Sequence, residues 1–121
     1  MKIIQINGNG YYGSTAKIVR QISNMLDARQ IENKIICSGY KEKSLDEKTI
    51  CISNRNKVKR HQRLAFVFGD AGFHSIWDTK KLIRYLKKEN PDIVHLHHLE
   101  GYFVHIKLLL KFLKKAKIKT I

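Results

Sequence analysis

The sequence has one proline, two cysteines and few acidic residues, and it has no long run of apolar residues. One proline and seven glycines in 121 residues exclude a collagen-like or linker-like chain. No apolar stretch reaches the roughly 18 residues that a membrane-spanning helix needs. The first seven residues have a short apolar stretch without a cleavage-site pattern. We therefore interpret them as a strand rather than a signal peptide, and we expect a cytoplasmic protein.

The two cysteines, Cys37 and Cys51, stand in separate apolar stretches and form no CxxC pair. This spacing supports neither a zinc site nor a redox motif. We expect two buried cysteines that behave as small hydrophobic residues.

Basic residues outnumber acidic ones by 24 to 10, which gives a net charge of +14. Fifteen of the basic residues lie in 57–121, so the second half of the chain carries most of the excess. A field of this sign favours an anionic partner such as a nucleic acid, a membrane surface or a phosphorylated substrate. The net charge alone does not distinguish among these three kinds of partner.

Apolar strands alternate with amphipathic helices along the chain. The predicted strands are 2–7, 33–38, 49–53 and 92–97, with 117–121 as the approach to a fifth. Four helices are predicted. The first begins at a cap on Ser14 or Thr15, and the third begins at a cap on Asp78. The second and fourth cover residues 57–68 and 104–115. This order predicts an α/β fold with a parallel sheet and helices on both faces. Because the fifth strand has barely begun at Ile121, we expect a domain that is incomplete at its carboxyl end.

Helical spacing also predicts which side chains face the core. The apolar face of the first helix comprises Ile18, Val19, Ile22, Met25 and Leu26. In the last helix it comprises Ile106, Leu109, Leu110 and Leu113, opposite a face of lysines.

Residues 8–13 match the pattern G-x-G-x-x-G between a strand and a helix. Glycines let the backbone approach a phosphate, and a helix amino terminus offers free N–H groups. A dinucleotide site also needs an acidic residue after the second strand, where Ser38, Gly39 and Tyr40 stand instead. We therefore expect no NAD and no other cofactor. A phosphate-binding loop of another kind and a glycine turn needed only for packing both remain open.

Four histidines lie close together in the sequence: His95, His97, His98 and His105. His95 and His97 share one face of a strand because side chains alternate. The group lacks the carboxylate or thiolate of most ligand sets, so we expect no metal. His97 and His98 stand at the carboxyl end of a parallel strand, where ligands bind in open α/β sheets.

The basic helix 57–68 and the lysine face of 104–119 have two interpretations. They are solvated surfaces, or they attach the chain to anionic lipid at the inner face of the cell membrane. A nucleic acid is not expected, because no nucleic-acid module and no cluster of stacking aromatics is present.

Several segments resemble the opening half of bacterial family-four glycosyltransferases of the capsular and exopolysaccharide type. They are residues 7–19, Gly72 to Ser75, Asn90 to His97 (Asn-Pro-Asp-Ile-Val-His-Leu-His) and Gly101 to Phe103. The resemblance implies a two-domain GT-B fold, of which residues 1–121 are the amino-terminal, Rossmann-like, acceptor-side domain. It implies retaining transfer from a nucleotide-sugar to a saccharide or lipid-linked saccharide acceptor. Since the second domain binds most of the donor, we expect this chain to be inactive on its own.

The resemblance places the loop 10–14 near the donor phosphates and gives no catalytic residue in this chain. The expected substrate-binding residues are Gly10, Tyr12, Gly13, Ser14, His97, His98, Gly101 and Tyr102. The sequence departs from the family at 98–100, where members commonly have Asn and then an apolar-His pair. The alternative function is a non-catalytic Rossmann-like module that binds a phosphate ligand or an anionic surface.

Overall fold

The computed structural model describes residues 1–10, 12–39, 46–70, 73–99 and 102–121. Within them, one parallel sheet has the strand order β3-β2-β1-β4-β5. The strands are β1 (Lys2–Ile6), β2 (Glu32–Cys37), β3 (Thr49–Cys51), β4 (Ile93–Leu96) and β5 (Lys119–Thr120). The helices are α1 (Ser14–Ala28), α2 (Arg55–Phe68), α3 (Ile76–Glu89) and α4 (Ile106–Lys115). The predicted Rossmann-like α/β fold is confirmed.

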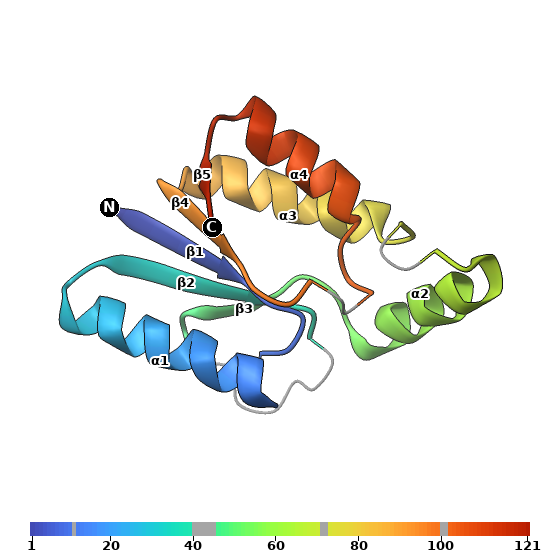
Figure 1. The fold of residues 1–121 in the computed structure, drawn as a ribbon, viewed down its shortest axis with the longest axis horizontal. Coiled ribbons are helices and arrows are strands. Elements are labelled where there is room, and N and C mark those ends of the chain that lie inside the picture. The colour runs from blue at the N-terminus through green and yellow to red at the C-terminus, as the bar shows by residue number, and fades with distance from the viewer. Residues whose placement is uncertain (11, 40–45, 71–72, 100–101) are drawn as a thin grey trace.

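Helices cover both faces of the sheet, as the sequence predicts. Figure 1 shows α1 on one side, α3 and α4 together on the other, and α2 beyond the carboxyl ends of the strands. In the part of the chain that the structure describes, no helix is long and apolar enough to cross a membrane.

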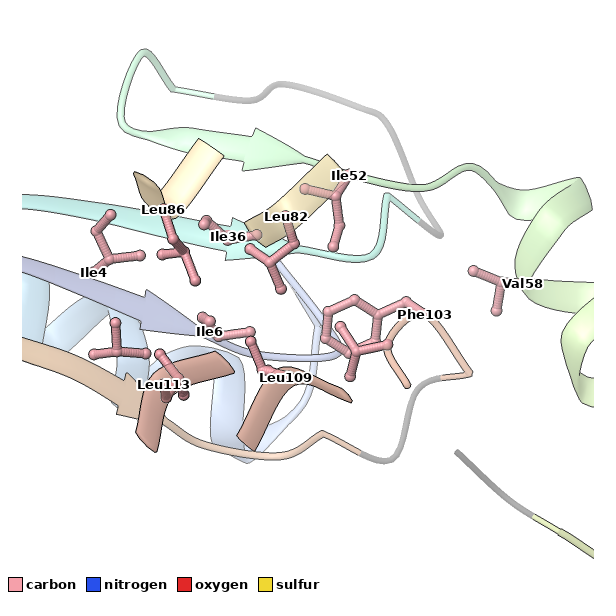
Figure 2. Close-up of a cluster of buried hydrophobic side chains, with 12 residues drawn as sticks. Ile4, Ile6, Ile36, Ile52, Val58, Leu82, Leu86, Phe103, Leu109 and Leu113 are labelled. Carbon is pink, nitrogen blue, oxygen red and sulfur yellow. The ribbon is translucent and has the colours of Figure 1, made fainter. Parts of the chain in front are cut away.

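The main core lies between the sheet and the α3–α4 layer (Figure 2). Ile4, Ile6 and Ile36 extend from β1 and β2 toward the leucines of the two helices. Those leucines, Leu82, Leu86, Leu109 and Leu113, are almost completely buried. Alternation along each strand directs these isoleucines to one face and leaves the intervening residues for the α1 face.

The face of the sheet under α1 is made of smaller and more polar residues, and here the predicted helix face is partly wrong. Ala16, Val19 and Ser23 are buried, whereas Ile18 and Met25 are 49% and 54% exposed. At 3.6 residues per turn, the buried stripe is rotated by about a quarter turn from the predicted one. Small side chains let α1 approach the sheet closely, and the Ser23 hydroxyl bonds the side chain of Asn33 on β2.

The start of α3 differs from the prediction that Asp78 caps it. The helix begins at Ile76, and Asp78 lies buried in its first turn. Its carboxylate accepts hydrogen bonds from the Ser53 hydroxyl at 2.8 Å and from Lys57 Nζ at 3.2 Å. The aspartate therefore joins α3 to α2 and to the end of β3.

Two helices expose large apolar residues, and one of these residues, Leu110, was predicted to lie in the core. Leu110 of α4 is exposed, whereas Leu109 and Leu113 are buried as predicted. At the end of α2, Phe66 is 90% exposed, and Val67 and Phe68 are also exposed. The apolar end of α2 therefore faces away from the sheet.

Candidate functional site

Three loops meet at the carboxyl edge of the sheet. The N–H of Gly8, just after β1, donates to the carbonyl of His98, after β4, at 2.7 Å. The carbonyl of Gly8 accepts a 2.6 Å hydrogen bond from the hydroxyl of Ser38, after β2. The loops that follow the three central strands are thus held in one fixed arrangement.

Asn7, which sequence reasoning did not select, strengthens this junction. Its side-chain Nδ2 donates to the carbonyl of Asn9 at 2.6 Å, and its Oδ1 accepts from the N–H of His98 at 3.3 Å. The side chain is fully buried. A polar residue directly after an apolar strand was the signal that could have identified it.

Gly10 is needed for packing in this loop. A Cβ atom added there would lie 2.8 Å from Sγ of Cys37. The Gly10 carbonyl also accepts a hydrogen bond from Nη2 of Arg20 at 3.3 Å, and the other terminal nitrogen of this guanidinium lies 3.4 Å from Asp46. Arg20 lies in the second turn of α1 and places a cation beside this loop. The sequence did not predict this position.

Tyr12, Gly13 and Ser14 are exposed at the amino end of α1. The predicted cap on Ser14 or Thr15 is wrong, because Gly13 is the N-cap residue and no described side chain caps the helix. Gly13 has φ +91° and ψ 171°, a conformation that is essentially restricted to glycine. A side chain there would meet nothing within 4 Å. Backbone conformation, rather than space, therefore requires glycine at this position.

His97 and His98 behave differently, although they are neighbours. The His98 side chain is exposed, and its backbone bonds Asn7 and Gly8 at the start of the glycine loop, residues 8–13. The His97 ring stacks on His95 at 4.0 Å and contacts Gln5, so it lies against the sheet. Burial, followed by the proximity of His95, lowers the pKa of His97 to about 4. The predicted shared face of His95 and His97 is confirmed.

Tyr102 is bound to α3 through its backbone. It has φ +51°, and its carbonyl accepts a 2.9 Å hydrogen bond from the hydroxyl of Ser75, the N-cap residue of α3. Its half-buried side chain packs against the main core. Gly101, the remaining predicted site residue, lies outside the described residues.

The position where a dinucleotide-binding fold has its acidic residue is filled by packed backbone. Ser38 is buried there, and a Cβ atom on Gly39 would lie 2.4 Å from the carbonyl oxygen of Ser53. Among the described residues, no group of three or more His, Cys, Asp or Glu side chains is arranged to hold a metal ion.

A surface hollow of about 650 Å³ lies at the opposite, amino edge of the sheet. Its lining includes Asn90, Pro91, Ala116 and Lys117. Ligands of open parallel sheets bind at the carboxyl edge, so the interlocked loops, not this hollow, form the candidate site.

The family model for Glycosyltransferase Family 4 matches residues 15–121. The match begins just after the glycine loop and includes β2 through β5. No curated protein and no solved structure matches the chain.

Proposed function

Because the chain belongs to glycosyltransferase family 4, we propose that residues 1–121 are the acceptor-side, amino-terminal domain of a sugar-transferring enzyme. The donor is a nucleotide-sugar, and the acceptor is a saccharide or lipid-linked saccharide of a bacterial surface polysaccharide. A second Rossmann-like domain then supplies most of the donor contacts, so this chain has no turnover on its own.

The observation that carries this proposal is the interlocking of the loops after β1, β2 and β4. The bonds from Gly8 to His98 and from Ser38 to Gly8 fix the carboxyl edge. A transferase needs a preorganised wall on which the reacting groups are held.

The chemistry of this edge suits a phosphate of the donor. The first turn of the 15-residue helix α1 presents backbone N–H groups and the positive end of the helix dipole. Ser14 is exposed there, and the Arg20 guanidinium lies beside Gly10. These groups attract a diphosphate.

Amide chemical shifts of the ¹⁵N-labelled chain test this site, with uridine diphosphate and guanosine diphosphate as probes. We expect shifts in residues 8–17 and at His98. Ser14→Glu introduces a negative charge where the phosphate would bind, so affinity should fall several-fold. Stability should hold, because an acidic residue is favourable in the first turn of a helix. Gln21→Glu, which is also exposed on α1, is the matched control.

Shifts confined to the amino-edge hollow, or no shifts at all, would contradict the proposed site. Turnover is tested separately with a panel of nucleotide-sugars and lipid-linked acceptors. Repeated turnover by the isolated chain would overturn its role as half of an enzyme. Diphosphate binding by a chain whose gene encodes no second domain would favour the non-catalytic module.

A membrane contact is the second part of the proposal. The end of α2 and the start of α3 each expose apolar residues and cations, and we refer to these residues together as the α2–α3 patch. It comprises Phe66, Val67, Phe68, Phe73 and Trp77, with Lys59, Arg63, Lys80 and Lys81. Lys80 Nζ lies 5.1 Å from the centre of the Trp77 ring. Exposed aromatics beside basic residues favour binding to anionic lipid, and α4 has only Leu110 as an exposed large apolar residue.

A further inference from the structure

Cys37 and Cys51 face each other across two neighbouring strands. They are paired in the register of β2 and β3, and their Sγ atoms lie 3.2 Å apart, so both thiols are reduced. Neighbouring strands are about 4.8 Å apart, which falls within the Cα separation of about 4.4–6.8 Å found in disulfides. Closing a bond of about 2.05 Å between the sulfurs therefore needs only a small movement.

The two thiols differ in access and in proton affinity. Cys37 is only 2% exposed, whereas Cys51 is half-buried on the edge strand β3. The hydrogen bond with Cys51 lowers the pKa of the Cys37 thiol, and the backbone N–H of Gly39 and the charge of Arg20 act in the same direction. The arrangement thus pairs one partly exposed cysteine with one buried cysteine whose thiol pKa is lowered.

We propose that Cys37 and Cys51 form a redox-reactive dithiol, which a peroxide oxidises to an intrachain disulfide beneath the glycine loop. Hydrogen peroxide oxidises the thiol of Cys51, the more exposed of the two cysteines, to a sulfenic acid, and one water leaves. The Cys37 sulfur then attacks the Cys51 sulfur and displaces the second water. In total, two thiols and one peroxide give one disulfide and two waters, and a dithiol reductant reverses the change.

The glycine loop rests on this pair. A Cβ atom on Gly10 would meet Cys37 Sγ at 2.8 Å, and one on Gly39 would lie 3.1 Å from Cys51 Cβ. Backbone therefore touches both cysteines, with no side chain between them to absorb a shift. A movement of the sulfurs is transmitted directly to Gly10 and to the edge strand.

Counting thiols tests the proposal cleanly, because the chain has only these two cysteines. The reduced protein should take up two maleimide labels after denaturation. After treatment with hydrogen peroxide it should take up none, remain monomeric, and lose the mass of two hydrogen atoms. Dithiothreitol should restore both labels. The melting temperature of the oxidised form should rise by about 5 °C or more, since a bond between residues 14 apart lowers the conformational entropy of the unfolded chain.

The serine variants are the matched controls. Cys37→Ser should stop at a Cys51 sulfenic acid that dimedone traps, and Cys51→Ser should retain a Cys37 that maleimide labels. Circular dichroism checks that both variants fold. Oxidation of the native chain should be about tenfold faster than in 8 M urea, because the fold places the sulfurs together. Two labels after peroxide, disulfide-linked dimers as the main product, or equal rates in urea would each overturn the proposal.

The effect on ligands rests on the function proposed for the loop. Uridine diphosphate affinity should differ at least threefold between the reduced and oxidised chains. If oxidation proceeds as described and neither form binds the nucleotide, the proposed phosphate site fails and the dithiol stands. Equal binding by both forms would show that the sulfurs do not act on the loop.

Discussion

Nε2 of His97 lies 3.0 Å from Oε1 of Gln5, and this contact joins the ends of β4 and β1 on the α1 face. An amide oxygen only accepts hydrogen bonds, so the ring nitrogen is the donor. The Gln5 nitrogen donates in turn to the carbonyl of Val19 on α1 at 3.2 Å. His97 is therefore part of the hydrogen-bonded packing between the sheet and α1.

The stability of the fold should fall as His97 is protonated. Its ordinary pKa of 6.5 drops to about 4 in the folded chain, chiefly through burial. Between these values the unfolded chain binds a proton that the folded chain does not. The stabilisation is thus complete above pH 6.5 and is lost toward pH 4, by on the order of 1 kcal/mol per pH unit. Urea unfolding should be measured from pH 7 to 4.5. The free energy of unfolding of His97→Gln should fall less steeply with decreasing pH than that of the native chain. His98→Gln should match the native chain, and equal slopes for all three would contradict this assignment.

Glu89 should control stability at lower pH. Its carboxylate accepts hydrogen bonds from Lys2 and Lys34, each at 3.0 Å, and these bonds lower its pKa from 4.5 to about 2. The stabilisation is present above pH 4.5 and disappears as the pH falls toward 2. Glu89→Gln should therefore be less stable than the native chain at pH 6 and nearly equal to it at pH 2. Glu47→Gln, on the exposed approach to β3, should change neither value. A constant deficit for Glu89→Gln at all pH values would rule out the ion pairs as the cause.

Gly13 should not tolerate replacement, even by a small residue. Its backbone angles are essentially restricted to glycine, so Gly13→Ala and Gly13→Asn should each cost about 1–3 kcal/mol. Gly69 ends α2 with φ +68° and ψ 19°, a left-handed conformation that asparagine adopts readily. Gly69→Asn should thus change stability much less. Both positions have open space, so a steric explanation predicts no loss at either. Thermal unfolding of the three variants separates the two explanations.

The α2–α3 patch should bind anionic vesicles. Trp77 is the chain's single tryptophan and is 77% exposed, so its fluorescence reports on this patch. Vesicles that contain phosphatidylglycerol should shift its emission to the blue, and phosphatidylcholine vesicles should not. Phe66→Ser combined with Arg63→Glu should weaken binding at least tenfold, because it removes an apolar anchor and reverses one charge.

The control changes the lysine face of α4 in the same way. Leu110→Ser combined with Lys111→Glu alters one exposed apolar residue and one charge there. It should weaken binding far less than the change in α2. Equal losses for the two double variants would show that net charge, rather than the patch, holds the lipid. Binding that salt does not reduce would exclude an electrostatic contribution.

The sequence predicts the fold well because the spacing of apolar residues and the order of strands and helices determine it. Buried parallel strands are continuous apolar runs, and the alternation of strands and helices leaves few ways to cover a parallel sheet. The orientation of α1 was missed because hydrophobicity ranks Ile18 and Met25 above Ala16 and Ser23. The sheet instead accepts the small side chains that allow close approach, and Ser23 finds its partner in Asn33.

The site was predicted only where a local pattern marks it. The glycine loop and the end of β4 are visible as motifs, and the structure joins them through Gly8 and His98. The pair Cys37 and Cys51 was not visible, because strand register brings together residues that are 14 apart in the sequence. The position of Arg20 beside Gly10 likewise depends on how α1 docks on the sheet.

The position of β1 in the sheet also determines the order in which the strands can pair during synthesis. β1 is synthesised before the other four strands of this sheet, yet it is the central one, and its partner on one side is β4. Lys2 and Asp92 exchange hydrogen bonds across 90 residues. During translation, β1 and β2 can pair early, but the other edge of β1 stays unpaired until residues 93–96 leave the ribosome. A nascent chain that stalls before that point exposes a strand edge of high β propensity, which is a site for association with other chains.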